Sequence, residues 1–200
     1  MILLNSSAFH IFWLGRYISR IQYVCNLFPF QQDDVANDYA QAFCLPAFDA
    51  ASLNQLVLDE EQSASFKQQF NFTKDNIHEL RGVLTAYGYA ELNKLIKTAS
   101  ENPGYICDVV TECFDILEAE SHDVFLFFKL GQSVEQLDRE LRLKHDISIT
   151  LQELSIVVTL LEELGWENLI ENWETMSKQK DWASFYQFTA AISEMFGVDA

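Results

Sequence analysis

The spacing of apolar residues is the feature that most constrains the fold of this chain. Apolar side chains recur every three or four residues through most of the sequence, which is the periodicity of helices with one buried face. The strict alternation typical of strands is hard to find, and 7 Gly and 3 Pro among 200 residues leave too few turns for an all-β fold. We predict an all-α fold: a single-domain helical bundle of about seven to nine helices over residues 1–200.

Helix boundaries follow from capping residues and breakers. The first helix is predicted from about Asn5 to Leu27, because Pro29 stops it. Two or three short helices follow in residues 31–70. The later helices are predicted at about residues 73–98, 103–119, 122–144, 150–165, 167–177 and 182–196.

Three local signals support these boundaries. Asn102 before Pro103 is a typical helix start, with the asparagine as cap and the proline at the first helical position. Thr150 and Glu153 have the spacing of a capping box, and Gly165 fits the C-terminal end of that helix.

The net charge of −17 limits the classes of partner. Residues 1–100 carry 7 basic and 10 acidic groups, while residues 101–200 carry 6 and 20. Such a negative surface repels phosphate backbones and anionic membranes, so we expect neither nucleic-acid nor membrane binding. Basic proteins would be attracted to it, although the charge can also serve solubility alone.

The cysteines and the N-terminus indicate the compartment. The four cysteines, Cys25, Cys44, Cys107 and Cys113, have no CxxC spacing and stand among apolar residues, so we interpret them as reduced core thiols. Arg16 and Arg20 interrupt the apolar N-terminal run before it could span a bilayer or form a cleavable signal. A cytoplasmic location is therefore predicted.

A weak internal repeat relates two segments. Residues 12–21 align with residues 128–137 so that Phe, Leu and Gly coincide, with Gly15 over Gly131. A glycine inside a helix costs about 1 kcal/mol relative to alanine, so two at matched positions suggest that two helices cross closely there. At such a crossing, Arg20 and Glu135 can meet as an ion pair.

These segments resemble motifs of the bacterial alpha-E domain family, an all-helical family named for a Glu-Arg pair. The resemblance covers roughly residues 5–145 and leaves residues 146–200 unmatched. It rests on Phe12 to Arg20, on Asn76 to Asn93, and on Phe128 to Asp138. The Glu-Arg pair is incomplete in both copies, standing as Ser19-Arg20 and as Glu135-Gln136.

The resemblance implies a set of site residues and a cellular role. The family motif positions are, in this sequence, Arg16, Arg20, Asn76, Arg81, Asn93, Glu135 and Asp138. Proteins of the family typically accompany a circularly permuted ATP-grasp ligase and a transglutaminase-like peptidase. The resemblance thus implies a non-catalytic helical partner or scaffold for peptide ligation and processing.

Two alternatives remain open from the residues. An enzyme or small-ligand binder could use a pocket lined by Arg16, Arg20, Arg81, Asn93 and Glu135, because arginine suits carboxylates and phosphates. The acidic C-terminal half could instead capture a basic protein. No cofactor and no metal are predicted, since the single Asp75-x-x-His78 falls short of a di-iron set and no Gly-rich phosphate loop is present.

Overall fold

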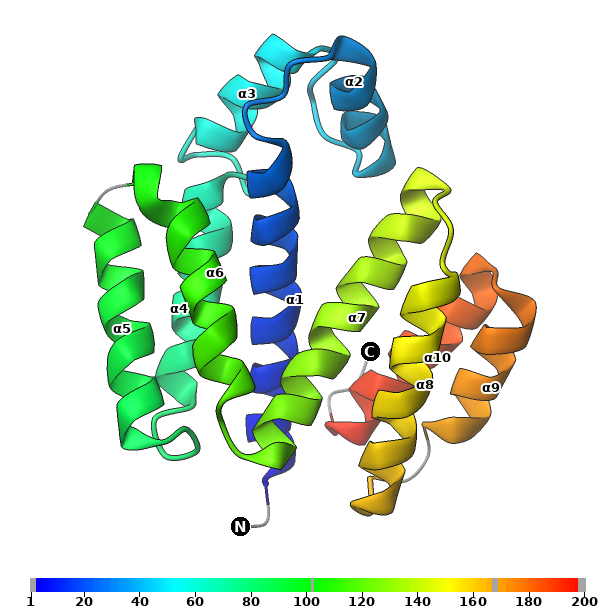
Figure 1. Cartoon of the computed structure of the whole chain (residues 1–200). Coiled ribbons are helices and arrows are strands. Elements are labelled where there is room, and N and C mark those ends of the chain that lie inside the picture. Colours follow the sequence, from blue (N-terminus) through cyan, green and yellow to red (C-terminus); the bar gives the residue numbers. More distant parts are fainter. Residues whose placement is uncertain (1–2, 102, 167–168, 198–200) are drawn as a thin grey trace. The chain divides into compact units, whose positions relative to one another are not determined.

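The computed structural model describes residues 3–101, 103–166 and 169–197, and over these residues the chain is helical without strands (Figure 1). Ten α-helices and one short 3₁₀ turn are found there, slightly more than the seven to nine predicted. The all-α prediction is confirmed. Among the described residues, none of the helices combines the length and apolar character that crossing a bilayer requires.

Packing divides the chain into two compact units, and α1 (Asn5–Leu27) contributes to both. The first unit contains the residues up to Arg16 and those from Ser121 onward, and the second contains Tyr17–Glu120. The expectation of one domain over residues 1–200 stays a prediction. The bounds of α1 agree with those predicted, and Ile11, Leu14, Ile18 and Ile21 form its buried stripe.

The first unit is built from the start of α1 and four further helices. These are α7 (His122–Leu143), α8 (Ser148–Glu163), α9 (Ile170–Gln179) and α10 (Trp182–Met195). In this unit α7 packs on α8, α8 on α9, and α9 on α10 (Figure 1). Gly165, predicted to end the helix that is now α8, lies just past its last turn and has a positive φ, as does Gly197 after α10. Ser121 precedes α7, and its side chain makes no capping hydrogen bond.

The second unit combines the rest of α1 with five α-helices and the 3₁₀ turn. They are α2 (Asp33–Ala42), α3 (Ala50–Leu58), α4 (Phe66–Glu79), α5 (Ala86–Glu101), η1 (Pro103–Tyr105) and α6 (Ile106–Glu118). Here α4 packs on α5 and α5 on α6. The helix start predicted near residue 103 is η1 followed by α6, while the predicted cap Asn102 lies outside the described residues.

Two predictions about helix boundaries are wrong. The single helix predicted over residues 73–98 is interrupted by a turn between α4 and α5, where the amide and hydroxyl of Thr85 both donate to the Glu120 carboxylate. The predicted capping box of Thr150 and Glu153 does not form, because α8 starts earlier and Asp146 accepts from the Ser148 amide (3.0 Å). Thr150 is buried and donates its hydroxyl to Glu140 (2.7 Å).

The cysteine prediction is also corrected in part. Cys25 near the end of α1 forms a disulfide with Cys107 of α6, within the second unit. Cys113 is a buried free thiol, as predicted, whereas the free thiol of Cys44 is exposed. The two bonded cysteines lie 82 residues apart, and no sequence spacing signals such a pair.

Candidate functional site

The predicted crossing of α1 and α7 at the two glycines is present. A methyl group placed on Gly15 would overlap the carbonyl oxygen of Phe128, and one placed on Gly131 would overlap that of Phe12. Each glycine therefore faces the backbone of the other helix. Only a hydrogen atom fits at either position, which explains why glycine stands inside two otherwise regular helices.

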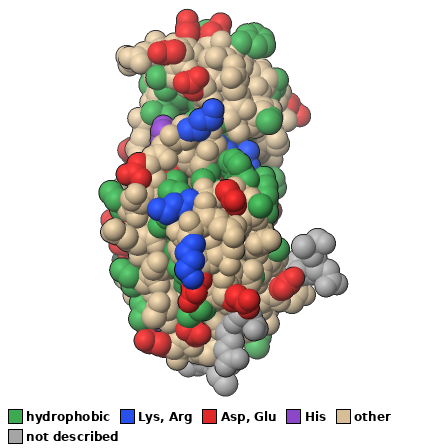
Figure 2. All heavy atoms as spheres, turned by 90° about the vertical axis from the view of Figure 1, so that its right-hand side faces the viewer, with side chains coloured by type: hydrophobic (Ala, Val, Ile, Leu, Met, Phe, Trp, Pro, Cys, Tyr) green, Lys and Arg blue, Asp and Glu red, His purple; other side chains and the backbone are tan. Residues whose placement is uncertain are grey.

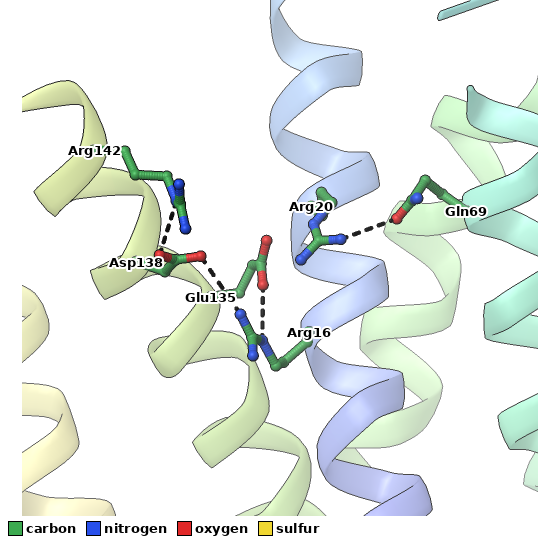
Figure 3. A network of polar contacts seen from close by, with 6 residues as sticks. All are labelled: Arg16, Arg20, Gln69, Glu135, Asp138 and Arg142. Carbon is green, nitrogen blue, oxygen red and sulfur yellow. Dashed lines mark hydrogen bonds and ion pairs between the residues drawn. The ribbon is translucent and has the colours of Figure 1, made fainter. Parts of the chain in front are cut away.

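This close crossing brings Arg16 to a carboxylate of α7. Arg16 directly follows Gly15, and Glu135 lies one helical turn beyond Gly131, so the two side chains meet just past the crossing. The Arg16 Nε donates to Glu135 Oε2 at 2.8 Å (Figure 3). The exposed fraction is 14% for the Arg16 side chain and 2% for that of Glu135, so this ion pair is largely withdrawn from water.

A second carboxylate and a second arginine extend the pair into a four-residue cluster. Asp138 Oδ2 lies 3.6 Å from Arg16 Nη2, and Asp138 Oδ1 accepts from Arg142 Nε at 3.0 Å (Figure 3). Two guanidinium groups thus face two carboxylates. We call Arg16, Glu135, Asp138 and Arg142 the charge cluster.

Aromatic rings support both arginines of the charge cluster. The Arg16 guanidinium carbon lies 5.0 Å from the centroid of the Trp13 ring, and that of Arg142 lies 5.4 Å from the Trp182 ring. A ring face attracts a cation and also excludes water from one side of it. The rings and carboxylates together hold both guanidinium groups in fixed positions.

The remaining predicted site residues lie in the second unit. Arg20 Nη1 donates to Gln69 Oε1 at 3.3 Å (Figure 3). The amide groups of Asn76 and Asn93 each donate to a carbonyl one turn earlier in their own helix, at Phe72 and Tyr89. Arg81 is exposed in the turn after α4.

The structure thus gathers three of the seven predicted site residues, Arg16, Glu135 and Asp138, and adds Arg142. The predicted pairing of Arg20 with Glu135 joins residues of different units, and it stays a prediction. Arg142 was missed, although its i,i+4 spacing from Asp138 is the ordinary signal of an ion pair on a helix.

Two buried polar atoms of α7 add to the site. Gln132 Oε1 and Ser133 Oγ have no hydrogen-bond partner among the described residues. Gln132 follows Leu130 and Gly131, and the motif that these residues resemble has the sequence Leu-Gly-Arg. Gln132 thus stands at the arginine position of that motif. A polar atom buried without a partner is unfavourable, so these two atoms are candidates for contact with a ligand.

No three His, Cys, Asp or Glu side chains of the described residues form a group that could hold a metal ion. An open surface depression of about 330 Å³ lies between α8 and the end of α9, and it shares no lining residue with the charge cluster. Its lining consists of Ser148, Leu151, Gln152, Ser155, Ser177 and Lys180.

The family of the chain is shown by comparison with family models. The model of the Alpha-E family, described as a predicted alpha-helical domain with a conserved ER motif, matches residues 3–178. The chain belongs to this family. The match extends past residue 145 into α8 and α9. Comparison with curated proteins and with solved structures found no match.

Proposed function

We propose that this Alpha-E protein is a non-catalytic helical partner, or scaffold, for an ATP-grasp ligase or a transglutaminase-like protein that makes or processes peptide bonds. The resemblance of its motifs to those of the family supports the choice of partner. The observation that carries the non-catalytic role is the pairing within the charge cluster.

A group that acts on a substrate has to be available to it. Arg16 is engaged by Glu135 at 2.8 Å and Asp138 at 3.6 Å, with the Trp13 ring on its face. To grip a substrate carboxylate, it would have to leave two carboxylates that are already in place. Removing one partner of a buried ion pair typically costs about 3 to 5 kcal/mol, so the paired carboxylates contribute to the fold, which favours a structural role for the cluster.

The incomplete Glu-Arg motif is consistent with this interpretation. Glu135 has Gln136 beside it in sequence, but it binds an arginine supplied by α1 across the glycine crossing. A glutamate and an arginine thus meet in space, although the residue after Glu135 in the sequence is a glutamine. The pair supports the packing of α1 on α7.

The test is capture of the partner by the full-length chain. A tagged copy should retain an ATP-grasp protein or a transglutaminase-like protein from native lysate, identified by mass spectrometry against a tag-only control. A captured ATP-grasp ligase should then release ADP faster with the chain than without it. Retention of chaperones alone would contradict the proposal.

Matched variants separate binding from folding in that test. Arg81→Ala changes an exposed residue and should leave the melting temperature unchanged. If Arg81 contacts the partner, retention falls while the melting temperature stays the same. Glu135→Gln changes a buried residue, so any loss in retention of the partner should be explained by a lower melting temperature.

A small-ligand binder is the second candidate, and the unpartnered atoms of Gln132 and Ser133 favour it. An amino acid or peptide that donates to Gln132 Oε1 and accepts from the Ser133 hydroxyl should raise the melting temperature of the wild-type chain. The Ser133→Ala variant should lose that increase. Identical shifts in the two proteins would reject this site.

A further inference from the structure

The disulfide of the second unit joins two helix ends near the surface. Cys25 lies in the last turn of α1 and Cys107 in the first turn of α6, and both residues are half-buried. Neither belongs to the buried core, so a reductant in the solvent has access to this part of the fold. The bond spans a sequence separation of 82 residues and thereby fixes the start of α6 to a distant part of the chain.

The outer face of α6 carries only negative charge. Its four exposed carboxylates are spaced three or four residues apart, so they lie on one side of the helix. They belong to Asp108, Glu112, Asp115 and Glu118. None of the four has an ion pair among the residues that the structure describes, and α6 itself contains no Lys, Arg or His. On the face shown in Figure 2, by contrast, Lys and Arg side chains lie among those of Asp and Glu.

This charge pattern destabilises α6. Like charges one turn apart on a helix repel each other, and each such pair weakens the helix. Asp108 is in the first turn, where the helix dipole favours a negative charge. Glu118 is the last residue of α6, where the dipole opposes a negative charge, and the last turn has no basic residue. The position of α6 therefore depends on its packing and on the bond at Cys107.

The inner face of α6 is apolar and contains a thiol. Its buried residues are Ile106, Val109, Val110, Cys113 and Leu117. α6 packs on α5 within the second unit (Figure 1). The exposed fraction of Cys113 is 0%, so an alkylating reagent reaches its thiol only after α6 has moved. The reactivity of Cys113 therefore reports whether α6 is in place.

We propose that the Cys25–Cys107 disulfide is a redox switch: the bond keeps α6 packed in the second unit, and its reduction lets α6 separate, driven by repulsion among its own carboxylates. A thiolate of a dithiol reductant attacks one sulfur atom, the Sγ–Sγ bond breaks, and the released thiolate takes up a proton. The second thiol of the reductant then displaces the remaining cysteine. The two cysteines gain two electrons and two protons in all, and the dithiol becomes a disulfide.

Charge repulsion distinguishes this bond from one that only adds stability. When a helix is favourable in itself, its packing keeps it in place after a disulfide has been reduced. In α6, four carboxylates act against that packing. Reduction should therefore open α6 locally, while the rest of the second unit stays folded.

The test is alkylation of Cys113 in the purified full-length chain, followed by peptide mass spectrometry. In the oxidised wild type Cys113 should react slowly, whereas the exposed Cys44 should react fast. Prior reduction with dithiothreitol should raise the rate at Cys113 by roughly 30-fold or more. The Cys25→Ser/Cys107→Ser variant should show the faster rate without any reduction.

Neutral variants test the driving force. In the reduced chain, Asp115→Asn with Glu118→Gln removes two of the four charges of α6 and should slow alkylation of Cys113 by roughly threefold or more. Asp75→Asn with Glu79→Gln is the matched control, because it removes two exposed carboxylates from the end of α4 instead. The control should leave the rate unchanged. Reduction should also speed hydrogen exchange in peptides of α6 and not in those of α4.

Two outcomes would overturn the proposal. One is a reduced chain in which Cys113 is as protected as in the oxidised chain, which would show that the bond only adds stability. The other is alkylation that accompanies global unfolding, detected as a loss of helical circular dichroism. No ligase enters these measurements, so failure here is distinct from failure of the proposed function.

Discussion

The two units contain different parts of the same helix and hold them by different means. In the first unit, the start of α1 touches α7 so closely that no side chain fits between them, and the charge cluster lies beside the contact. In the second unit, the end of α1 is bonded covalently to α6 through Cys25 and Cys107. The start of α1 is thus held by close packing and ion pairing, and its end by a covalent bond.

This difference predicts distinct sensitivities. Buried ion pairs and closely packed backbones are sensitive to shifts of a few tenths of an ångström. Single substitutions in the first unit should therefore lower the free energy of unfolding considerably. A disulfide acts mainly by restricting the unfolded chain, so the second unit should respond to reducing agents.

The largest effect is expected from Glu135→Ala. The substitution removes the nearer of the two carboxylates that face the Arg16 guanidinium. Of the charge cluster, only the more distant carboxylate of Asp138 then remains beside it. Loss of one partner of a buried pair should reduce the free energy of unfolding by about 3 to 5 kcal/mol. Urea denaturation measures the loss, and hydrogen exchange should locate it in peptides of the first unit.

Glu153→Ala is the matched control for Glu135→Ala. Glu153 is also paired with a cation, but the side chains of this pair are 30% and 40% exposed. Such a pair contributes about 0 to 1 kcal/mol. Equal losses for the two variants would show that burial of the charge cluster has no energetic consequence.

Reduction of the Cys25–Cys107 disulfide should have the next largest effect. Its removal should cost about 2 to 4 kcal/mol, with faster hydrogen exchange in the second unit. Dithiothreitol should lower the melting temperature of the wild type and leave that of Cys25→Ser unchanged. A wild type insensitive to reductant would contradict the covalent link.

The free cysteines provide an internal check on that experiment. Burial, with a smaller contribution from Glu112, raises the pKa of the Cys113 thiol to about 12, so at pH 8 it stays protonated and unreactive. Cys44 is exposed and should be alkylated. Mass spectrometry of the oxidised native chain should therefore find one label on Cys44 and none on Cys113.

Gly131→Ala should cause the next largest loss of stability. The added methyl overlaps the Phe12 carbonyl oxygen, so α1 and α7 have to move apart. Overpacking of this kind typically costs about 1 to 3 kcal/mol. Gly82→Ala is the control, because nothing lies within 4 Å of its added methyl, and it should change stability by less than about 0.5 kcal/mol.

The smallest effect concerns pH and should appear in both units. In the second unit, hydrogen bonds from the hydroxyl and amide of Ser52 lower the pKa of Asp49. In the first, those from the amide and hydroxyl of Ser184 lower the pKa of Asp181. A carboxyl with a lower pKa in the folded state stabilises the fold above its unfolded pKa and loses this contribution as the pH falls.

Both helix caps should therefore weaken as the pH drops below about 4, near the pKa of an unfolded aspartate. Melting temperatures measured between pH 6 and 3 test this. Asp181→Asn keeps a capping side chain without a titrating group, so its melting temperature should depend less on pH. An unchanged dependence would mean that other carboxyls dominate.

The sequence predicted what depends on local pattern. The bounds of α1 follow from apolar periodicity and Pro29, and the crossing follows from two glycines at matched positions. The end of α4 was missed because the turn after it is held by Glu120, which is 35 residues from Thr85. A capping group so distant in sequence leaves no local signal.

The site was predicted in part for a related reason. Arg16 and Arg20 are one turn apart on α1, so sequence alone does not single out Arg16 as a partner of Glu135. The pairing of Arg16 with Glu135 depends on how the start of α1 is shifted along α7, and the contact at Gly15 and Gly131 sets that register. Thr150 was misassigned for the same kind of reason, since its partner Glu140 belongs to the preceding helix.

The glycine crossing also has a consequence for recognising distant relatives. An ion pair can be rearranged by substitution, because an arginine one turn away or on another helix can supply the same charge. Two carbonyl oxygens that occupy the space of a methyl group allow no such exchange. In a sequence whose Glu-Arg pair has drifted beyond detection, the two helical glycines should be the more durable marker of common descent.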